Sequence, residues 1–231
     1  RRGNFNGFRK DTIMNLSGKK INFLGDSITH GSGTSGEDKR FSNLIAAKTG
    51  AICRNYGIGG TRIARQFNRT IPDFDDNDYC SRVCKMDPDA DIIGVFGGTN
   101  DFGHGDAPLG TPTDRTDGTF YGAMHVLCNR LIERYPDAAI VFITPLHRCN
   151  EASLRGDNKP MDIGNLKTYV DIIREVTEYY SLPVLDLYAT SGLQPLVPVI
   201  KEKFVPDGLH PNDAGHVILA DKIIAFLENT L

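Results

Sequence analysis

Apolar residues cluster into short runs along the chain, and long polar or glycine-rich stretches separate these runs. Most runs are rich in Ile, Val and Phe and end at Gly, Pro or Asp, which is typical of buried strands. Because the runs are continuous rather than alternating, they indicate a parallel sheet that is covered on both faces. The predicted strands are Ile21–Leu24, Ala51–Tyr56, Asp91–Phe96, Ala139–Thr144 and Pro183–Leu187.

Helical spacing of apolar residues fills the intervals between these strands. Strong patterns cover 119–135 and 165–180, weaker ones cover 41–48 and 78–86, and Asn212 is the expected N-cap of a last helix. The apolar side chains expected to be buried on the three strongest helices are Met124, Leu127, Cys128, Leu131, Ile132, Leu166, Tyr169, Ile173, Val176, Val217, Ile218, Ile223, Ile224 and Leu227. Strands that alternate with helices predict right-handed βαβ units and an α/β fold, a three-layer α/β/α sandwich.

Length and charge narrow the class of protein further. A chain of 231 residues fits a single domain over 14–231, preceded by a polar extension or tag remnant over 1–13. The net charge of −3 gives no electrostatic reason to expect a nucleic acid partner. No apolar run approaches the roughly 18 residues that a membrane span needs, so no integral membrane association is expected.

The number and spacing of the cysteines indicate in which cellular compartment the protein is expected. The five cysteines are scattered and odd in number, which is typical of reduced thiols, and a cytoplasmic location is therefore expected. Cys80 and Cys84 have a spacing that also occurs in metal and redox sites, but no second pair accompanies them. Residues 1–13 lack the apolar segment of a secretory signal, so they are not expected to be an intact signal peptide. The alternative to a cytoplasmic location is a secreted form from which the signal has been cleaved.

One strand end carries candidate chemistry. The run Ile21–Leu24 stops at Gly25-Asp26-Ser27, which places a serine at the carboxyl end of a buried strand. In open α/β sheets the ligand crevice lies just outside such strand ends. A serine there can act as a nucleophile if a base, an acid and an anion-stabilising pocket converge on it.

Three other segments supply those groups. Asp207 and His210 lie three positions apart, so the carboxylate can hold the imidazole on one side of a turn, although a plain surface turn has the same pattern. Asn100 follows the third predicted strand and can direct its amide at a developing oxyanion, or simply bond its own turn. Gly60 follows the second strand and can offer a backbone N–H. Because each segment supplies one required group, the joint pattern is stronger than its parts.

In these residues the chain resembles the GDSL-type esterases and lipases, also called SGNH hydrolases. Gly25-Asp26-Ser27-Ile28 is similar to the nucleophile block of that family, with Ile28 where Leu is commonest. Gly60 and Asn100 match its oxyanion residues, although Gly59 leaves an offset of one open, and Asp207 and His210 match its Asp-x-x-His block. The resemblance implies a flavodoxin-like five-stranded parallel sheet, with Ser27 N–H, Gly60 N–H and the Asn100 side chain as the oxyanion hole.

Further polar residues are weaker candidates for contact with substrate. They lie beside the nucleophile or on two long loops, 102–118 and 145–164, that follow strand ends and are expected to wall the crevice. These candidates are Asp26, His30, His104, His147 and Arg148. Solvated or structural roles are the alternatives for the histidines, and Asp26 points away from the site if the strand alternation continues. His125 and His216 lie in helical patterns and are expected to be structural.

The pattern therefore predicts a serine ester hydrolase with a Ser27–His210–Asp207 triad, no metal and no cofactor. The polar loop 103–118 favours short-chain or acetyl esters, including carbohydrate-borne ones. Related alternatives are a lysophospholipase, a lipase-like acylhydrolase or a thioesterase. The alternative of another class is a non-catalytic carbohydrate-binding module on the same fold. The sequence has no Gly-x-Ser-x-Gly elbow and no phosphate-binding loop, so these other enzyme classes are not expected.

Overall fold

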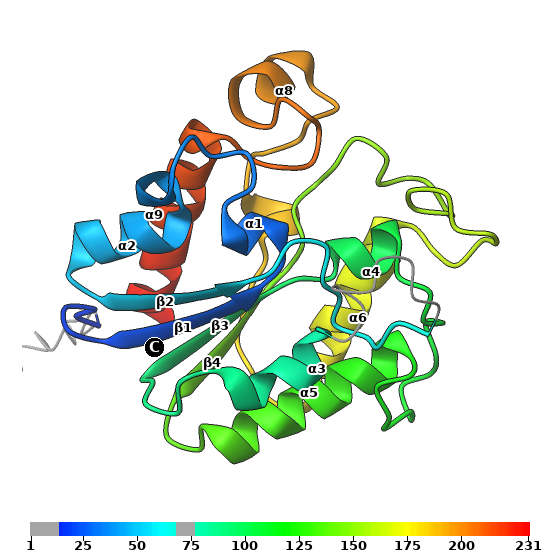
Figure 1. Ribbon diagram of the computed structural model, residues 1–231, viewed down its shortest axis with the longest axis horizontal. Coiled ribbons are helices and arrows are strands. Elements are labelled where there is room, and N and C mark those ends of the chain that lie inside the picture. The colour runs from blue at the N-terminus through cyan, green and yellow to red at the C-terminus, as the bar shows by residue number, and fades with distance from the viewer. Residues whose placement is uncertain (1–13, 68–76) are drawn as a thin grey trace, which may run out of the picture.

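The computed structural model describes residues 14–67 and 77–231, so the polar segment 1–13 lies outside the described residues. Five parallel strands form one sheet in the order β2-β1-β3-β4-β5. The strands are β1 (Lys20–Gly25), β2 (Ile52–Gly57), β3 (Ile92–Phe96), β4 (Ala139–Ile143) and β5 (Val184–Leu185). This is the flavodoxin-like order, and it confirms the predicted α/β fold (Figure 1).

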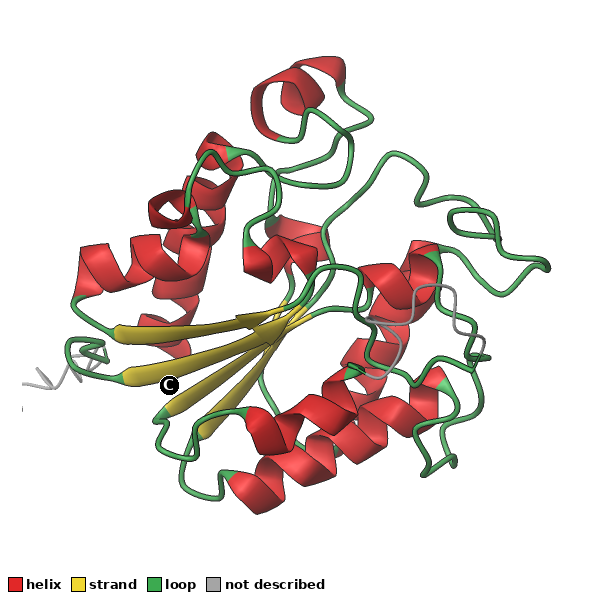
Figure 2. Cartoon of the chain, viewed as in Figure 1, coloured by secondary structure: helices red, strands yellow, loops and turns green. Residues whose placement is uncertain are grey.

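Helices cover both faces of the sheet (Figure 2). The helices are α1 (Ser27–His30), α2 (Phe41–Thr49), α3 (Tyr79–Arg82), α4 (Thr99–Gly103), α5 (Phe120–Arg134), α6 (Leu166–Tyr179), α7 (Leu187–Thr190), α8 (Pro198–Phe204) and α9 (Asp213–Thr230), with 3₁₀ turns η1 (Glu37–Lys39) and η2 (Val83–Lys85). In Figure 1, α2 and α9 lie on one face, and α3, α5 and α6 lie on the other. The arrangement confirms the three-layer sandwich.

Alternating strand residues divide the core in two. Leu24 of β1 packs with α3, α5 and α6, whereas its neighbour Phe23 packs with α2 and α9. This follows from the two-residue repeat of a strand, which sends successive side chains to opposite faces. Both layers are apolar, and this explains why the strands read as continuous hydrophobic runs.

Two of the side chains predicted to be buried are in fact on the surface. Val217 of α9 is 39% exposed and Ile132 of α5 is 36% exposed. The buried face of α9 includes Leu219, Ala220 and Ile223. Val217 lies two positions before Leu219, which is about 200° around the helix, so it points away from the sheet.

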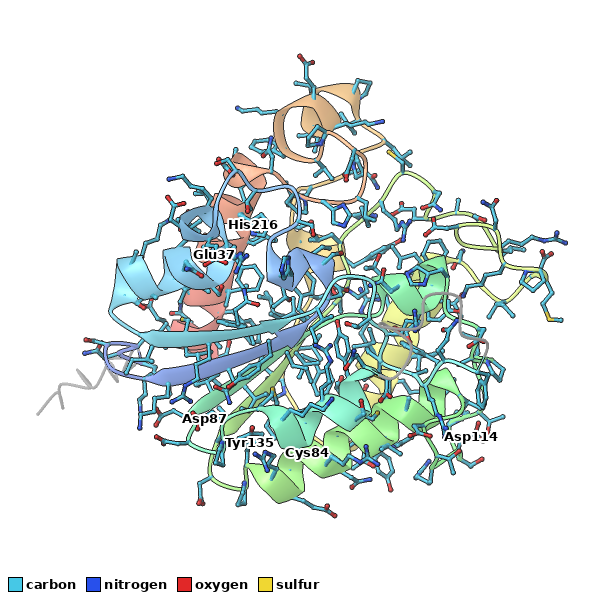
Figure 3. The ribbon with its side chains drawn as sticks, in the orientation of Figure 1. Glu37, Cys84, Asp87, Asp114, Tyr135 and His216 are labelled. Atoms are coloured by element: carbon cyan, nitrogen blue, oxygen red, sulfur yellow. The ribbon has the colours of Figure 1, made fainter. Side chains whose placement is uncertain are left out.

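Capping explains where several elements begin. Asn212 is the N-cap of α9, as predicted, and its side chain accepts a hydrogen bond from Gly215 N–H. The predicted strand over 183–187 shortens to Val184–Leu185 because Asp186 caps the short helix α7 instead. His216 of α9 (labelled in Figure 3) accepts a hydrogen bond from Phe41 N–H at the start of α2, and its ring stacks on the Phe41 ring.

The register aligns the strand ends that matter for function. Gly25, the last residue of β1, pairs with Gly57 of β2 on one side and Phe96 of β3 on the other. The segments that follow these three strands therefore start at one edge of the sheet.

Within residues 14–67 and 77–231, no helix combines the length and apolar character needed to cross a membrane.

Candidate functional site

Ser27 begins a one-turn helix directly after β1. The preceding residue, Asp26, caps α1 by accepting a hydrogen bond from Ile28 N–H. The turn between strand and helix requires glycine at position 25, because a Cβ there would overlap the Thr29 side chain. The hydroxyl-bearing residue is thereby held at the carboxyl end of a central strand, where a nucleophile can face a ligand.

His210 and Asp207 meet Ser27 from the far end of the chain. The Ser27 Oγ lies 2.9 Å from His210 Nε2, and His210 Nδ1 lies 2.7 Å from Asp207 Oδ2. The imidazole therefore bridges the hydroxyl and the carboxylate. This arrangement can take a proton from the serine while the carboxylate holds the ring in place.

In the loop between α8 and α9, backbone N–H groups donate hydrogen bonds to the Asp207 carboxylate. Asp207 Oδ1 accepts hydrogen bonds from the backbone N–H groups of Leu209 and His210, at 2.8 and 2.7 Å. Burial acts to raise the pKa of Asp207, but the hydrogen bonds from His210 and Leu209 outweigh it and hold the pKa below its ordinary value. The carboxylate therefore stays ionised beside the imidazole.

Asn100 lies in α4, the short helix that follows β3. Its side-chain Nδ2 donates to the carbonyl oxygen of Thr61 at 2.9 Å, which links α4 to the segment after β2. That segment carries Gly60, whose φ of +75° is in the left-handed region that favours glycine. A Cβ built on Gly59 would be 3.8 Å from Ser27 Cβ, so the segment passes beside the nucleophile.

Backbone donors are available at this edge. The N–H groups of Ser27, Gly59 and Gly60 have no hydrogen-bond partner within the part of the chain that the structure describes. Unpaired backbone N–H groups beside a serine are the groups that an oxyanion hole uses. Both Gly59 and Gly60 therefore remain candidates for the second donor, with Asn100 as the side-chain donor.

Two residues expected to contact substrate do not reach the surface. Asp26 is 2% exposed and serves as the cap of α1, and burial raises its pKa to about 6. Arg148 is 5% exposed and forms an ion pair with Asp157 at 2.6 Å. Each of these charged groups is hydrogen-bonded or ion-paired inside the fold, so nothing in the structure supports a contact with substrate for either.

The three candidate histidines remain at or near the surface. His30 is exposed at the end of α1, and His104 is exposed just after α4. His147 is partly buried, with Nδ1 2.6 Å from Glu151 Oε2 and its ring against Tyr188. Loop 145–164, which carries His147, and the start of loop 102–118, which carries His104, follow β4 and α4 on the side of the carboxyl ends of the strands (Figure 1). None of these contacts assigns a role in substrate binding.

Several buried polar residues that support the site were missed from the sequence. The Arg82 guanidinium donates to the carbonyl oxygens of Tyr56 and Gly25, at 2.8 and 2.9 Å, and so ties the ends of β2 and β1 together. The carboxylate of Asp101, in α4, accepts hydrogen bonds from Ile63 and Ala64 N–H, each at 2.9 Å. A single Arg or Asp within a helical pattern is normally predicted to be exposed. No local sequence signal therefore indicates that Arg82 and Asp101 are buried.

The remaining candidate chemistry does not assemble. Among the described residues, no group of three or more His, Cys, Asp or Glu side chains could hold a metal ion. All five cysteines are free, and Cys80 is buried while Cys84 is exposed.

Comparison with known proteins agrees with this geometry. A model of the GDSL-like lipase/acylhydrolase family matches residues 23–218, which include Ser27, Asn100 and His210. The chain belongs to this family. The family is one of acylhydrolases, so the protein is a hydrolase by membership. The comparison with curated proteins gives no match.

Solved structures of similar chains share the GDSL fold. A protein from Lactobacillus plantarum is 30% identical with a TM-score of 0.80, and the match covers 94% of this chain and 99% of that one. The lipase/acylhydrolase from Enterococcus faecalis is 22% identical with a TM-score of 0.63, and the match covers 91% and 95% of the two chains. The second likeness concerns the fold alone.

Proposed function

We propose that the protein is a serine ester hydrolase that works by two-step acyl transfer. The observation that carries the proposal is the continuous hydrogen-bonded path from Ser27 Oγ through the His210 ring to the Asp207 carboxylate. Membership of an acylhydrolase family supports the same reaction class. In this proposal Ser27 is the nucleophile, His210 the general base and acid, and Asp207 the group that orients His210.

In the first step, Ser27 Oγ attacks the ester carbonyl carbon while His210 Nε2 takes the hydroxyl proton. The carbonyl oxygen becomes an oxyanion, and the N–H groups of Ser27 and Gly60 and the Asn100 side chain donate hydrogen bonds to it. The C–O bond to the leaving group then breaks, and His210 gives its proton to the departing alcohol. This leaves an acyl ester on Ser27.

In the second step, water replaces the alcohol. His210 takes a proton from the water as the water attacks the acyl carbon, and the same donors hold the second oxyanion. The bond from the acyl carbon to Ser27 Oγ breaks, and His210 returns the proton to the serine. The products are the carboxylic acid and the unchanged enzyme.

Short-chain or acetyl esters, including carbohydrate-linked ones, are the proposed substrates. The polar composition of the loop at 103–118 supports this proposal, and its side chains Thr111, Thr113 and Arg115 are exposed. A polar surface suits a sugar hydroxyl or a small acyl group better than a long alkyl chain, which gains by burying apolar area.

A lipase-like activity on longer acyl chains is the second candidate. Exposed apolar side chains on loop 145–164 and around α8 favour it, namely Leu154, Met161, Leu196, Val197 and Val199. Leu196, Val197 and Val199 lie at or just before the start of α8, the helix that precedes the Asp207–His210 turn in the chain. A series of p-nitrophenyl esters from acetate to palmitate separates the two candidates, and acetylated xylan tests the carbohydrate-linked case.

The reaction itself is tested by removing the nucleophile. Ser27→Ala is expected to abolish turnover of p-nitrophenyl acetate, whereas Ser17→Ala, at the opposite end of β1, is the matched control and is expected to keep it. A fluorophosphonate probe should label the wild-type protein at Ser27. Activity that survives in Ser27→Ala would refute the proposed nucleophile, and a wild-type protein that neither labels nor turns over ester would instead be a binding module.

A further inference from the structure

Two consecutive residues of loop 145–164 touch both halves of the candidate site. The Arg148 guanidinium lies 3.3 Å from both the carbonyl oxygen and the hydroxyl of Thr99, the first residue of α4. The next residue, Cys149, donates its N–H to the Gly208 carbonyl oxygen at 2.9 Å. Gly208 lies inside the Asp207–His210 turn, so the loop connects the helix that carries Asn100 to the turn that carries the imidazole.

The helix α4 depends on outside contacts to keep its shape. It has five residues, and so short a helix is not stable by itself in water. Loop 145–164 provides contacts along it, because Asp157 N–H donates to the Gly103 carbonyl at 2.7 Å and Lys159 Nζ donates to the Asp101 carbonyl at 2.5 Å. Cationic and N–H groups at these carbonyls stabilise the carboxyl end of the helix.

The Arg148 side chain is fixed in one direction. It is buried, its Nη2 is 2.6 Å from Asp157 Oδ1, and its guanidinium lies 5.2 Å from the centre of the Phe102 ring. Phe102 is itself a residue of α4 and is fully buried. A planar guanidinium that is paired, stacked and bonded to the backbone holds geometry more tightly than an ammonium group can.

We infer that Arg148 is a positioning residue that acts on the reaction through Asn100. It fixes Thr99, the neighbour of Asn100, and so sets where the Asn100 amide lies relative to the oxyanion. The inference rests on the proposed function. Displacement of a catalytic group by about 1 Å can cost roughly 100-fold in rate, so a modest shift of α4 has a measurable effect.

A double-mutant cycle tests this directly. Arg148→Lys keeps the charge but loses the planar fork, and we expect a roughly 10- to 100-fold fall in kcat with KM changed less than about twofold. Asn100→Ala alone should lower kcat by about 10²–10³. If Arg148 acts through Asn100, adding Arg148→Lys to Asn100→Ala should lower kcat by no more than about twofold further.

The matched control is Arg155→Lys on the same loop, where the arginine forms an exposed ion pair with Asp162. That variant should keep wild-type kcat and KM. If Arg148→Lys fails to fold, Asp157→Asn is used in its place. Asp157→Asn removes the carboxylate that pairs with the guanidinium, while residue 148 is still arginine. Circular dichroism and thermal unfolding establish that each variant is folded.

Two outcomes would overturn the inference. One is a cycle in which the effects of Arg148→Lys and Asn100→Ala on kcat multiply, which would show that Arg148 acts independently of Asn100. The other is a rise in KM with kcat unchanged, which would show a role in ground-state binding. Failure of the proposed function is separate, because it would appear as activity retained in Ser27→Ala.

Discussion

The side-chain amide of Asn100 donates one hydrogen bond to the carbonyl oxygen of Thr61, at 2.9 Å. Asn100 follows β3 and Thr61 follows β2, so the contact joins the segments on both sides of β1, the strand that carries the nucleophile. An amide has two N–H donors, and this bond uses one of them. It therefore fixes the direction of the side chain and leaves the other N–H for a developing oxyanion.

Removing this amide should affect the transition state more than substrate binding. Asn100→Ala is expected to lower kcat by about 10²–10³ and to change KM much less, because the oxyanion forms only during the reaction. Steady-state kinetics with p-nitrophenyl acetate measures both constants. Asn229→Ala at the exposed end of α9 is the matched control. A large rise in KM at unchanged kcat would contradict the role given to Asn100.

Replacing Asp207 should impair the orientation and charge stabilisation of His210. Asp207→Asn is expected to lower kcat by roughly 10²–10⁴, since the amide cannot stabilise an imidazolium and can favour the wrong tautomer. The exposed Asp221→Asn, which removes only a surface ion pair with Lys48, should leave kcat unchanged. An Asp207→Asn enzyme that is folded and as active as the wild type would exclude Asp207 from the triad.

The turn before Ser27 should tolerate no side chain at position 25. Gly25→Ala is expected to destabilise the fold by about 1–3 kcal/mol and to reduce activity, because the new Cβ would overlap Thr29. Gly59→Ala is the matched comparison on the other side of the nucleophile, where the nearest atom to a new Cβ is 3.8 Å away. Its free energy of unfolding should change by less than about 1 kcal/mol. Equal losses in the free energy of unfolding of Gly25→Ala and Gly59→Ala, measured by urea unfolding, would contradict this steric explanation.

His216 should make the fold less stable in acid. Burial lowers its pKa to about 4 from the ordinary 6.5, so between these pH values the unfolded chain binds a proton that the folded chain does not. Stability is therefore lost as the pH falls through this window, by up to about 3 kcal/mol. His216→Gln should lose about that much less than the wild type between pH 7 and 4, as measured by urea unfolding. Parallel pH dependences would refute this.

Asp26 should act in the opposite direction over much the same range. Burial raises its pKa to about 6, so from about pH 4 to 6 the folded chain binds the proton more tightly than the unfolded chain. Its contribution to stability is therefore lost as the pH rises, by up to about 3 kcal/mol. Asp26→Asn should gain that much relative to the wild type between pH 4 and 7. A constant difference between the two proteins across this range would show that Asp26 titrates normally.

Much of the fold could be predicted because its signals are local. Apolar runs marked the strands, the helical stripes marked α5, α6 and α9, and Asn212 marked the start of the last helix. The short helices α1, α4, α7 and α8 were not predicted. Four to seven residues carry too little periodicity to be recognised, and tertiary contacts stabilise such helices rather than their own sequence.

The sequence by itself determined which chemical groups this protein has and which strand ends they follow, because residue types and hydrophobic periods are local properties. Tertiary structure alone decided which charged groups face the solvent and which support the fold from within. Arg148 shows this, since Thr99 and Phe102, which contact its guanidinium, come from a distant segment. A buried charge is tolerated only where folding brings such partners to it, and no local pattern records that.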